Sequence, residues 1–276
     1  MSFDMEEVNQ YIQRFSQRIQ KPKQLQSNEN LKVGVDLGTA NIVLAVLDGQ
    51  NTPITGSSFE ATVVRDGLVI DYVGAVEIVK KLKEEVEEKI GVELTKAAGS
   101  VPPGTLGNNM KAIQNVLESA MFDVTKIVDE PTAAASVLGI KDGAVVDVGG
   151  GTTGISILKD GEVIYTGDEP TGGTHMTLTL SGYYQISNEE AEMLKRNKQR
   201  EDEVFPVIQP VVEKMASITK RHIQGYDVDT IFVVGGSSSF SKFTDVFTKE
   251  IGIPCLKPSH PLLITPLGIA MNCVEE

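Results

Sequence analysis

The 276-residue sequence is poor in the residues that usually build metal-binding or disulfide-linked sites. Its two cysteines, Cys255 and Cys273, form neither a CxxC pair nor a disulfide framework, so we expect free thiols in a reducing compartment. Its three histidines, His175, His222 and His260, lie far apart and form no HExxH or HxH pair. A zinc enzyme is therefore not expected.

Positive charge and long apolar runs are also scarce. The sequence has 25 Lys and Arg against 38 Asp and Glu, a formal net charge of −13, which is unsuited to gripping nucleic acid or an anionic membrane. The longest apolar run, residues 42–47, falls far short of the roughly 20 residues that a membrane helix needs. The acidic residues 1–7 lack the apolar core of a secretory signal. We expect a cytoplasmic protein that binds neither nucleic acid nor membrane.

Residues 4–19 have the pattern of an amphipathic helix, and a polar linker follows at residues 21–30. The apolar residues at helical spacing are Val8, Tyr11, Ile12, Phe15 and Ile19. An isolated helix of this length is marginal in water, so its apolar stripe needs a surface to cover it. We predict that the helix docks on another protein; the alternative is that it packs against the protein's own core.

The rest of the chain contains one pattern twice. A strand ending in an aspartate and glycines is followed by a returning strand and an Asp-Gly pair. The first copy has Asp36 and then Asp48-Gly49, and the second has Asp147 and then Asp160-Gly161. This repetition predicts an α/β fold made by internal duplication, with a cleft between the halves. Helices are predicted near residues 75–90, 109–120, 132–138, 188–198, 206–223, 241–250 and 267–274.

The turn of each repeated hairpin is rich in glycine and threonine. Glycines bring successive backbone N–H groups close to an anion, which is typical of a phosphate nest. Threonine adds a hydroxyl donor, and the aspartate can hold Mg²⁺ through the water molecules of the ion. Two such turns in corresponding places predict phosphate binding rather than two ordinary tight turns. The turn residues are Gly38, Thr39, Gly149, Gly150, Gly151 and Thr152.

A literal GxGxxG match at residues 149–154 does not indicate a dinucleotide site. Such a site needs a helix after the glycines, whereas the alternation around Ile155 and Ile157 predicts a strand. The sequence contains no GxxxxGK[ST], so it has no P-loop. A further turn, Gly235-Gly236-Ser237, follows a predicted strand and can let a flat or charged ligand approach a helix N-terminus.

In their order, these segments resemble the actin/Hsp70/sugar-kinase superfamily of ATPases. The segments that carry this resemblance are 36–41, 130–134, 147–153 and 235–237. The sequence is more closely similar to the EutJ family, a chaperone-like family encoded with ethanolamine-utilisation enzymes. Further segments that carry this similarity are 101–105, 115–120 and 187–195.

The resemblance implies an α/β, actin-like (ribonuclease H-like) fold: a duplicated two-domain ATPase with ATP and Mg²⁺ between the domains. The expected division is a helix and linker at 1–30, a first domain at 31–143 and a second at 144–259, with a C-terminal helix at 260–276 returning to the first domain. Short connections between the shared motifs predict reduced outer subdomains.

The same resemblance implies roles for individual residues. The catalytic carboxylates would be Asp36, Glu130 and Asp147, of which Asp36 and Asp147 would hold Mg²⁺ through water. The phosphates of ATP or ADP would lie on Gly38, Thr39, Gly149, Gly150, Gly151 and Thr152, and the adenosine on Gly235, Gly236 and Ser237. Ribose and adenine contacts would come from Glu192, Lys195 and Arg196. The helical spacing of these three residues equally predicts a solvent-exposed ion-pair cluster.

Departures from the superfamily pattern bear on hydrolysis. Asn109 stands where MreB-like proteins carry a carboxylate near the attacking water, and Ser239 stands where Hsp70 proteins often carry an arginine. Hydrolysis depends on positioning and charge stabilisation, so we expect at most a slow ATPase. The sequence reaches Glu276 without a peptide-binding domain, so a complete Hsp70 cycle is not expected.

Three functions remain open. The first is an ATP- and Mg²⁺-binding, chaperone-like accessory protein of ethanolamine utilisation, acting on an ethanolamine-degrading enzyme or its compartment. The second is a non-catalytic, actin-like scaffold of the bacterial microcompartment. The third is a small-molecule kinase, for which the first half is too short. The implied partners are ethanolamine-utilisation enzymes or microcompartment shell proteins, either in the bacterial cytoplasm or associated with a microcompartment.

Overall fold

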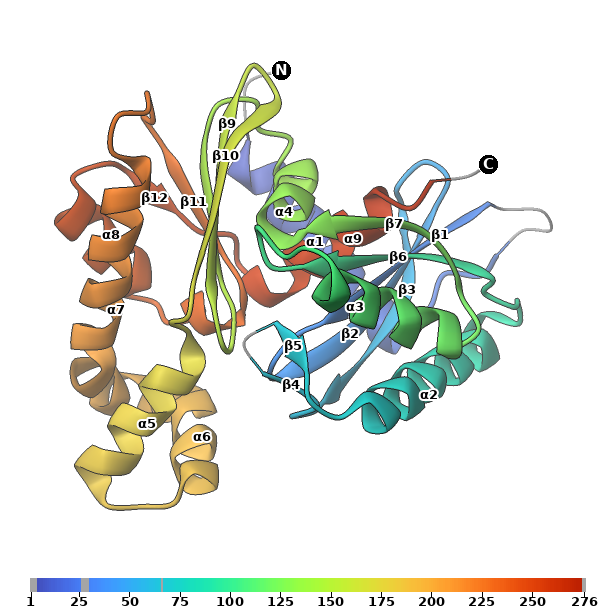
Figure 1. The fold of residues 1–276 in the computed structure, drawn as a ribbon, viewed down its shortest axis with the longest axis horizontal. Helices are drawn as coiled ribbons and strands as arrows, with labels where there is room; N and C mark the ends of the chain where they lie inside the picture. The colour runs from blue at the N-terminus through green and yellow to red at the C-terminus, as the bar shows by residue number, and fades with distance from the viewer. Residues whose placement is uncertain (1–3, 26–29, 66, 275–276) are drawn as a thin grey trace.

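Two five-stranded sheets with the same strand order form the framework of the molecule (Figure 1). The computed structural model describes residues 4–25, 30–65 and 67–274. Parts of the expected linker (26–29) and of the expected C-terminal segment (275–276) therefore lie outside the described residues. We call the parts of the chain that carry the first and second sheets the first and second halves.

The strands of the two sheets correspond one to one. In spatial order, the first sheet contains β3 (Pro53–Glu60), β2 (Asn41–Asp48), β1 (Leu31–Leu37), β6 (Lys96–Val101) and β7 (Asp123–Asp129). The second contains β10 (Glu162–Glu169), β9 (Thr153–Lys159), β8 (Gly143–Val148), β11 (Ile231–Val234) and β12 (Cys255–Leu256). In each sheet the first three strands pair antiparallel and the last three pair parallel. The predicted duplication therefore extends over both sheets.

Helices cover the sheets, and a small hairpin of β4 (Val64–Arg65) and β5 (Leu68–Val69) stands apart. The helices are α1 (Met5–Gln20), α2 (Tyr72–Ile90), α3 (Asn108–Ser119), α4 (Glu130–Leu138), α5 (Gly173–Tyr184), α6 (Asn188–Arg196), α7 (Glu201–Ile223), α8 (Phe243–Ile251) and α9 (Ile264–Met271). Helices α2 and α3 pack on the first sheet, and α7 and α8 pack on the second. Helices α5 and α6 pack on each other and adjoin α7.

Helices α4 and α9 pack together between the two sheets (Figure 1). Most of their residues are apolar, and six of nine in α4 and seven of eight in α9 are buried, as expected of helices packed between two layers. The start of α4 is fixed locally, because the Asp129 side chain accepts a hydrogen bond from the Thr132 N–H at 3.0 Å. Gly139 ends the helix with a φ angle of 63°. Glu130 is thereby fixed in the first turn of α4.

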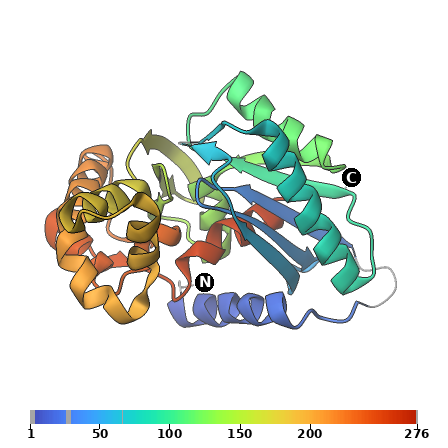
Figure 2. The same cartoon turned by 90° about the horizontal axis from the view of Figure 1, so that it is seen from below.

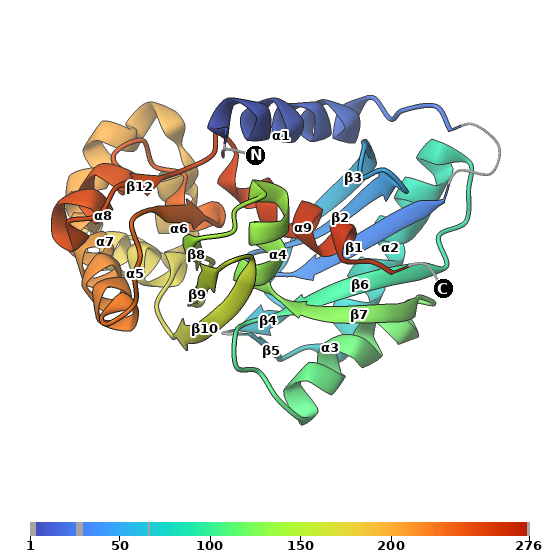
Figure 3. The same cartoon turned by 90° about the horizontal axis from the view of Figure 1, so that it is seen from above.

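Helix α1 lies along one side of the molecule and packs against the protein itself (Figures 2 and 3). Ile12 and Phe15 have no exposed surface, and Val8 is 8% exposed. The helix also reaches the second half, because the Ser259 N–H donates a hydrogen bond to Asn9 Oδ1 at 2.8 Å. The prediction that this helix docks on a partner is therefore wrong, since its apolar stripe is already covered by its own core.

Several other elements differ from the sequence-based prediction. Helix α5 was not predicted, because its glycine- and threonine-rich sequence has little helical periodicity. Strand β3 was also missed, since its proline, glycine and serines are typical of a loop. Helix α7 begins at Glu201 rather than Pro206, and its acidic first turn favours that earlier start.

Two further features of the described chain concern its helices and its cysteines. None of the described helices combines the length and apolar character needed to cross a membrane. Cys255 and Cys273 are both buried, and each is a free thiol.

Candidate nucleotide site

The two glycine-rich turns predicted to bind phosphate lie against each other. A Cβ atom placed on Gly150, in the turn after β8, would be 3.2 Å from the Thr39 Cβ atom and 3.3 Å from the Ala40 Cβ atom. Thr39 and Ala40 lie in the turn after β1, together with Gly38. These short distances leave little room for a side chain, so glycine allows the close approach of the two turns.

Two other segments donate hydrogen bonds to the second glycine-rich turn. Ser237 Oγ donates a hydrogen bond to the Gly149 carbonyl at 2.8 Å, and the Gly173 N–H donates to the same oxygen at 3.0 Å. The N–H and hydroxyl of Thr174 donate to the Gly150 carbonyl at 2.8 and 2.9 Å. The remaining residues of this turn, Gly151 and Thr152, are buried. The start of α5 and the turn after β11 therefore fix the position of the second turn.

Three predicted carboxylates lie close enough to influence one another: Asp36, Glu130 and Asp147. Burial raises the pKa of Glu130 well above its ordinary value, and the charges of Asp147 and Asp36 raise it further. Burial also raises the pKa of Asp36 to about 7, with the charge of Asp147 adding to the shift. The pKa of Asp147 rises to about 6, again through burial. The structure thus gathers carboxylates from β1, α4 and β8 into one electrostatic environment.

Two hydroxyl groups that the sequence analysis did not single out bind these carboxylates. Ser100 Oγ donates to Asp36 Oδ1 at 3.4 Å, and Thr265 Oγ1 donates to Asp147 Oδ2 at 2.5 Å. Each bond lowers the pKa of its carboxylate, opposing the effect of burial. The sequence feature that could have pointed to Thr265 is that it is the one hydroxyl-bearing residue in the otherwise apolar run of residues 261–271.

Asp168, at the end of β10, was also missed. Its charge contributes to the raised pKa of Glu130, as does the charge of Asp129. The corresponding position on β3 is Ser58, which is not acidic, so comparison of the two repeats gave no signal for Asp168.

The predicted adenosine turn adjoins the carboxylates. Gly235 has a φ angle of 84°, and a Cβ atom there would overlap Asp147 Oδ1 and the Val148 carbonyl. Only glycine combines this backbone angle with such a close approach. Gly236 and Ser237 follow in the same turn, and Ser237 is the residue bonded to the Gly149 carbonyl.

The three charged residues predicted to contact ribose and adenine form an ion-pair cluster on α6. Glu192 lies 2.6 Å from Lys195 Nζ and 2.7 Å from Arg196 Nε. Lys195 Nζ also donates to the Gly173 carbonyl at 3.0 Å, so the cluster adjoins the segment that holds the second turn. Burial lowers the pKa of Lys195, although Glu192 opposes that shift. The ion pairs are present; nucleotide contact by these residues stays a prediction.

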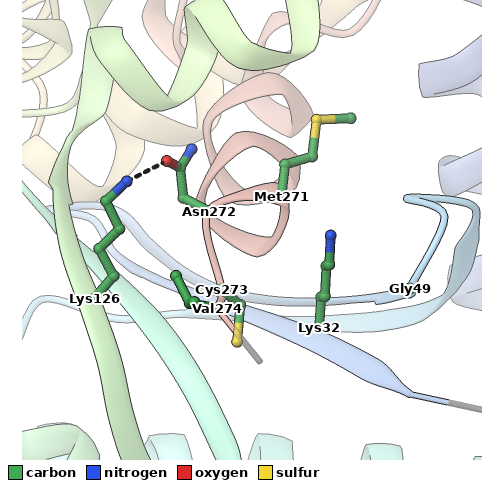
Figure 4. A pocket seen from close by; sticks show the side chains of 7 residues that line it. All are labelled: Lys32, Gly49, Lys126, Met271, Asn272, Cys273 and Val274. Atoms are coloured by element: carbon green, nitrogen blue, oxygen red, sulfur yellow. Dashed lines mark hydrogen bonds between the residues drawn. The ribbon is translucent and has the colours of Figure 1, made fainter. Parts of the chain in front are cut away.

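The described residues contain no group of three or more His, Cys, Asp or Glu side chains placed to hold a metal ion directly. Two surface hollows of about 380 Å³ lie away from the facing turns. One is lined by Lys32, Lys126, Asn272 and Cys273 among others, and there Lys126 Nζ donates to Asn272 Oδ1 at 2.8 Å (Figure 4). The other lies beside α1 and is lined by Arg14, Gln17, Arg18, Gln20 and Lys21. Neither hollow includes a predicted site residue.

Comparison with known proteins places the chain among related families. The family model of MreB/Mbl protein matches residues 55–197, and that of the type IV pilus assembly protein PilM matches residues 139–260. The chain is 44% identical to the ethanolamine utilization protein EutJ of Escherichia coli (strain K12), over 89% of this chain and 87% of that protein.

Solved structures agree with the sequence matches. The crystal structure of EutJ from Carboxydothermus hydrogenoformans superposes with a TM-score of 0.91 and 46% identity, covering 97% of this chain and 98% of that chain. MreB5 of Spiroplasma citri bound to AMPPNP superposes with a TM-score of 0.71 and 16% identity, covering 87% and 95% of the two chains. The latter likeness shows the actin-like fold alone. The chain therefore belongs to the EutJ family of ethanolamine utilization proteins, within the actin/Hsp70 ATPase superfamily.

Proposed function

We propose that the chain binds ATP or ADP with Mg²⁺ between its two halves, at the facing glycine-rich turns. The observation that carries the proposal is the approach of Gly150 to Thr39 and Ala40, which puts two phosphate-type turns side by side. Both turns supply backbone N–H groups and threonine hydroxyls, which suit the phosphates of a nucleotide. The similarity in fold to MreB5 bound to AMPPNP supports a nucleotide as the ligand.

The carboxylates beside the turns fit a divalent cation. Burial and neighbouring negative charges raise the pKa values of Asp36 and Glu130, so a cation among them would relieve an unfavourable arrangement. No direct cluster of metal ligands exists in the described chain, so Asp36 and Asp147 would hold Mg²⁺ through its water molecules. Such an ion neutralises the charge that develops on the phosphates during hydrolysis.

We propose that this site serves a chaperone-like accessory role in ethanolamine utilisation, with hydrolysis well below the enzyme median of about 10 per second. The EutJ relatives support the pathway. Asn109, exposed in the first turn of α3, offers an amide where a carboxylate would orient water, which supports slow turnover. Brisk, Mg²⁺-dependent phosphate release by the purified protein alone would contradict this part of the proposal.

A second candidate is a non-catalytic scaffold of the same pathway. It is favoured by the ion pairs of Glu192, Lys195 and Arg196, which bind one another rather than standing open to a ligand. A scaffold would bind nucleotide weakly or not at all, so a binding measurement separates the two candidates.

We further propose that residues 31–143 and 144–259 act as the two domains of this ATPase, with α9 returning to the first. The contacts of α9 with β1, β2 and β6 support that division. The partners would be ethanolamine-degrading enzymes or shell proteins of a microcompartment in the bacterial cytoplasm. Co-fractionation of the protein with purified microcompartments, with and without Mg·ATP, tests the association.

Calorimetric titration with ATP and with ADP, each with and without Mg²⁺, tests the proposed site. Asp147→Asn removes a charge from the site, and Asp160→Asn removes the same charge from the exposed turn between β9 and β10. We expect Asp147→Asn to weaken Mg²⁺-dependent binding and Asp160→Asn to leave it unchanged. Equal effects of the two changes would remove Asp147 from the site, and absence of any nucleotide binding would favour the scaffold.

A further inference from the structure

Helix α9 packs tightly against two of the elements that carry the site carboxylates. A Cβ atom on Gly34, two residues before Asp36 on β1, would overlap the backbone of Ala270 on α9. A Cβ atom on Gly268 of α9 would overlap the carbonyl of Ala133 on α4. Backbone contacts this close leave α9 little freedom to shift relative to β1 or α4.

The same helix also reaches the third carboxylate. Thr265, in the first turn of α9, donates a hydrogen bond from Oγ1 to Asp147 Oδ2 at 2.5 Å. Both side chains are buried, at 4% and 5% exposure, and the bond joins residues 118 positions apart in the sequence. Helix α9 therefore contacts the elements that carry Asp36, Glu130 and Asp147.

The other oxygen of Asp147 is restrained as well. Asp147 Oδ1 lies so close to the α-carbon of Gly235 that a Cβ atom there would overlap it. One carboxylate oxygen is therefore held by a hydroxyl and the other is confined by backbone. A carboxylate restrained on both sides has one preferred orientation, which suits it to accept a hydrogen bond from a water in the octahedral shell of Mg²⁺.

We propose that Thr265 is a positioning residue that orients Asp147 toward the water shell of Mg²⁺. The inference rests on the proposed function, since it concerns the metal of the same site. Thr265 does not touch nucleotide or metal in this role; it acts through the carboxylate. Groups that orient a directly coordinating ligand typically contribute about 10- to 100-fold to metal affinity; because Asp147 acts through water, the lower end of that range is the expected effect here.

The test compares Thr265→Val, which keeps the shape and removes the hydroxyl, with Thr265→Ser, which restores the hydroxyl. Calorimetry measures the Kd for ATP with Mg²⁺, with Ca²⁺ and with EDTA in the full-length protein. We expect Thr265→Val to weaken Mg·ATP binding by about 10-fold or more and to leave metal-free ATP within about twofold. Binding with Ca²⁺ should fall less, because Ca²⁺ tolerates irregular geometry. Thr265→Ser should restore the preference for Mg²⁺.

The outcomes separate this inference from the proposed function. Wild-type protein that binds Mg·ATP, together with a Thr265→Val variant that binds it equally well, would overturn the role of Thr265 alone. Equal losses with Mg²⁺, Ca²⁺ and EDTA would also overturn it, because they would indicate a general structural effect. Wild-type protein that binds no Mg·ATP would overturn both proposals. If Thr265→Val does not fold, Thr265→Cys, with a weak S–H donor, supports the same comparison.

Discussion

Arg196 at the end of α6 reaches across to Glu60 at the end of β3, with 2.5 Å between Nη1 and Oε1. The ion pair joins the second half to the first beside the first glycine-rich turn, because Glu60 pairs with Asn41 at the start of β2. Arg196 is also paired with Glu192, which binds Lys195, and Lys195 binds the carbonyl of Gly173. A chain of polar contacts therefore connects the edge of the first sheet to the segment that holds the second glycine-rich turn.

We predict that Glu60→Gln will speed nucleotide release without lowering the melting temperature measurably. The Glu60 side chain is 75% exposed and that of Arg196 is 37% exposed, and ion pairs this open to solvent contribute little to stability. Loss of the contact should free the two halves to separate, and we expect release of a fluorescent ATP analogue to be about two- to fivefold faster by stopped flow.

Asp202→Asn is the matched control for this prediction. Asp202 Oδ1 lies 2.9 Å from Lys242 Nζ, in an exposed ion pair confined to the second half. Raised salt should speed release from the wild type and from Asp202→Asn, and should have a smaller effect on Glu60→Gln. Equal release rates for Glu60→Gln and the wild type would show that the pair does not restrain the halves.

The parts of the fold that could be predicted are those that short sequence patterns specify. The two hairpins were recognisable because an aspartate, glycines and a threonine occur together within each turn, and the repeat then implied two similar halves. Local patterns did not reveal contacts between residues far apart in the sequence. Nothing near Thr265 in the sequence points to Asp147, because their bond depends on how α9 is wedged between the sheets.

The failed prediction for α1 has a related cause. The spacing of Val8, Ile12 and Phe15 correctly indicated a helix with one apolar face. Helical periodicity shows that an apolar face must be covered, but it does not show which surface covers it. The covering surface includes Gly56 on β3, whose missing side chain leaves room for the Phe15 ring, and a glycine in a loop-like segment gave no signal of that role.

We predict that Phe15→Ala will destabilise the whole protein. Phe15 has no exposed surface and packs in the core shared by α1, α4 and α9, so its truncation should cost about 3–5 kcal/mol of unfolding free energy. Urea unfolding measures the change. Gln13→Ala, on the exposed face of the same helix, should stay within about 0.5 kcal/mol of the wild type. A near-neutral Phe15→Ala would mean that α1 is not part of the cooperative core.

We predict that Asp36 and Asp147 contribute a loss of stability to the metal-free protein as pH rises from about 4 to about 7. The pKa of Asp36 is raised from 3.8 to about 7 and that of Asp147 from 3.8 to about 6. A carboxyl group with a raised pKa in the folded state contributes stability below its unfolded pKa and loses it as pH rises through the folded pKa. Melting temperatures between pH 4 and 8 measure this slope.

Asp36→Asn is the variant that tests the assignment of this pH dependence. It removes one titrating group and the repulsion of Asp147, so the slope should flatten and stability at pH 8 should rise. Glu6→Gln, on the exposed side of α1, should leave the slope unchanged. Added Mg·ATP should stabilise the wild type most at high pH, where the carboxylates are charged. An unaltered slope in Asp36→Asn would place its origin elsewhere.

We predict that Gly150→Ala will weaken nucleotide binding more than it weakens the fold. The new methyl group would lie 3.2 Å from the Thr39 Cβ atom and 3.3 Å from the Ala40 Cβ atom, so the two turns must move apart by a few tenths of an ångström. We expect the Kd for Mg·ATP to rise at least about fivefold, which corresponds to roughly 1 kcal/mol.

Gly182→Ala is the matched control, because a Cβ atom there meets nothing within 4 Å and the residue lies inside α5. That change should leave binding unaltered and add about 0.5–1 kcal/mol of stability. Calorimetry and urea unfolding of both variants measure the two effects, and unchanged binding by Gly150→Ala would show that the facing turns do not hold the nucleotide.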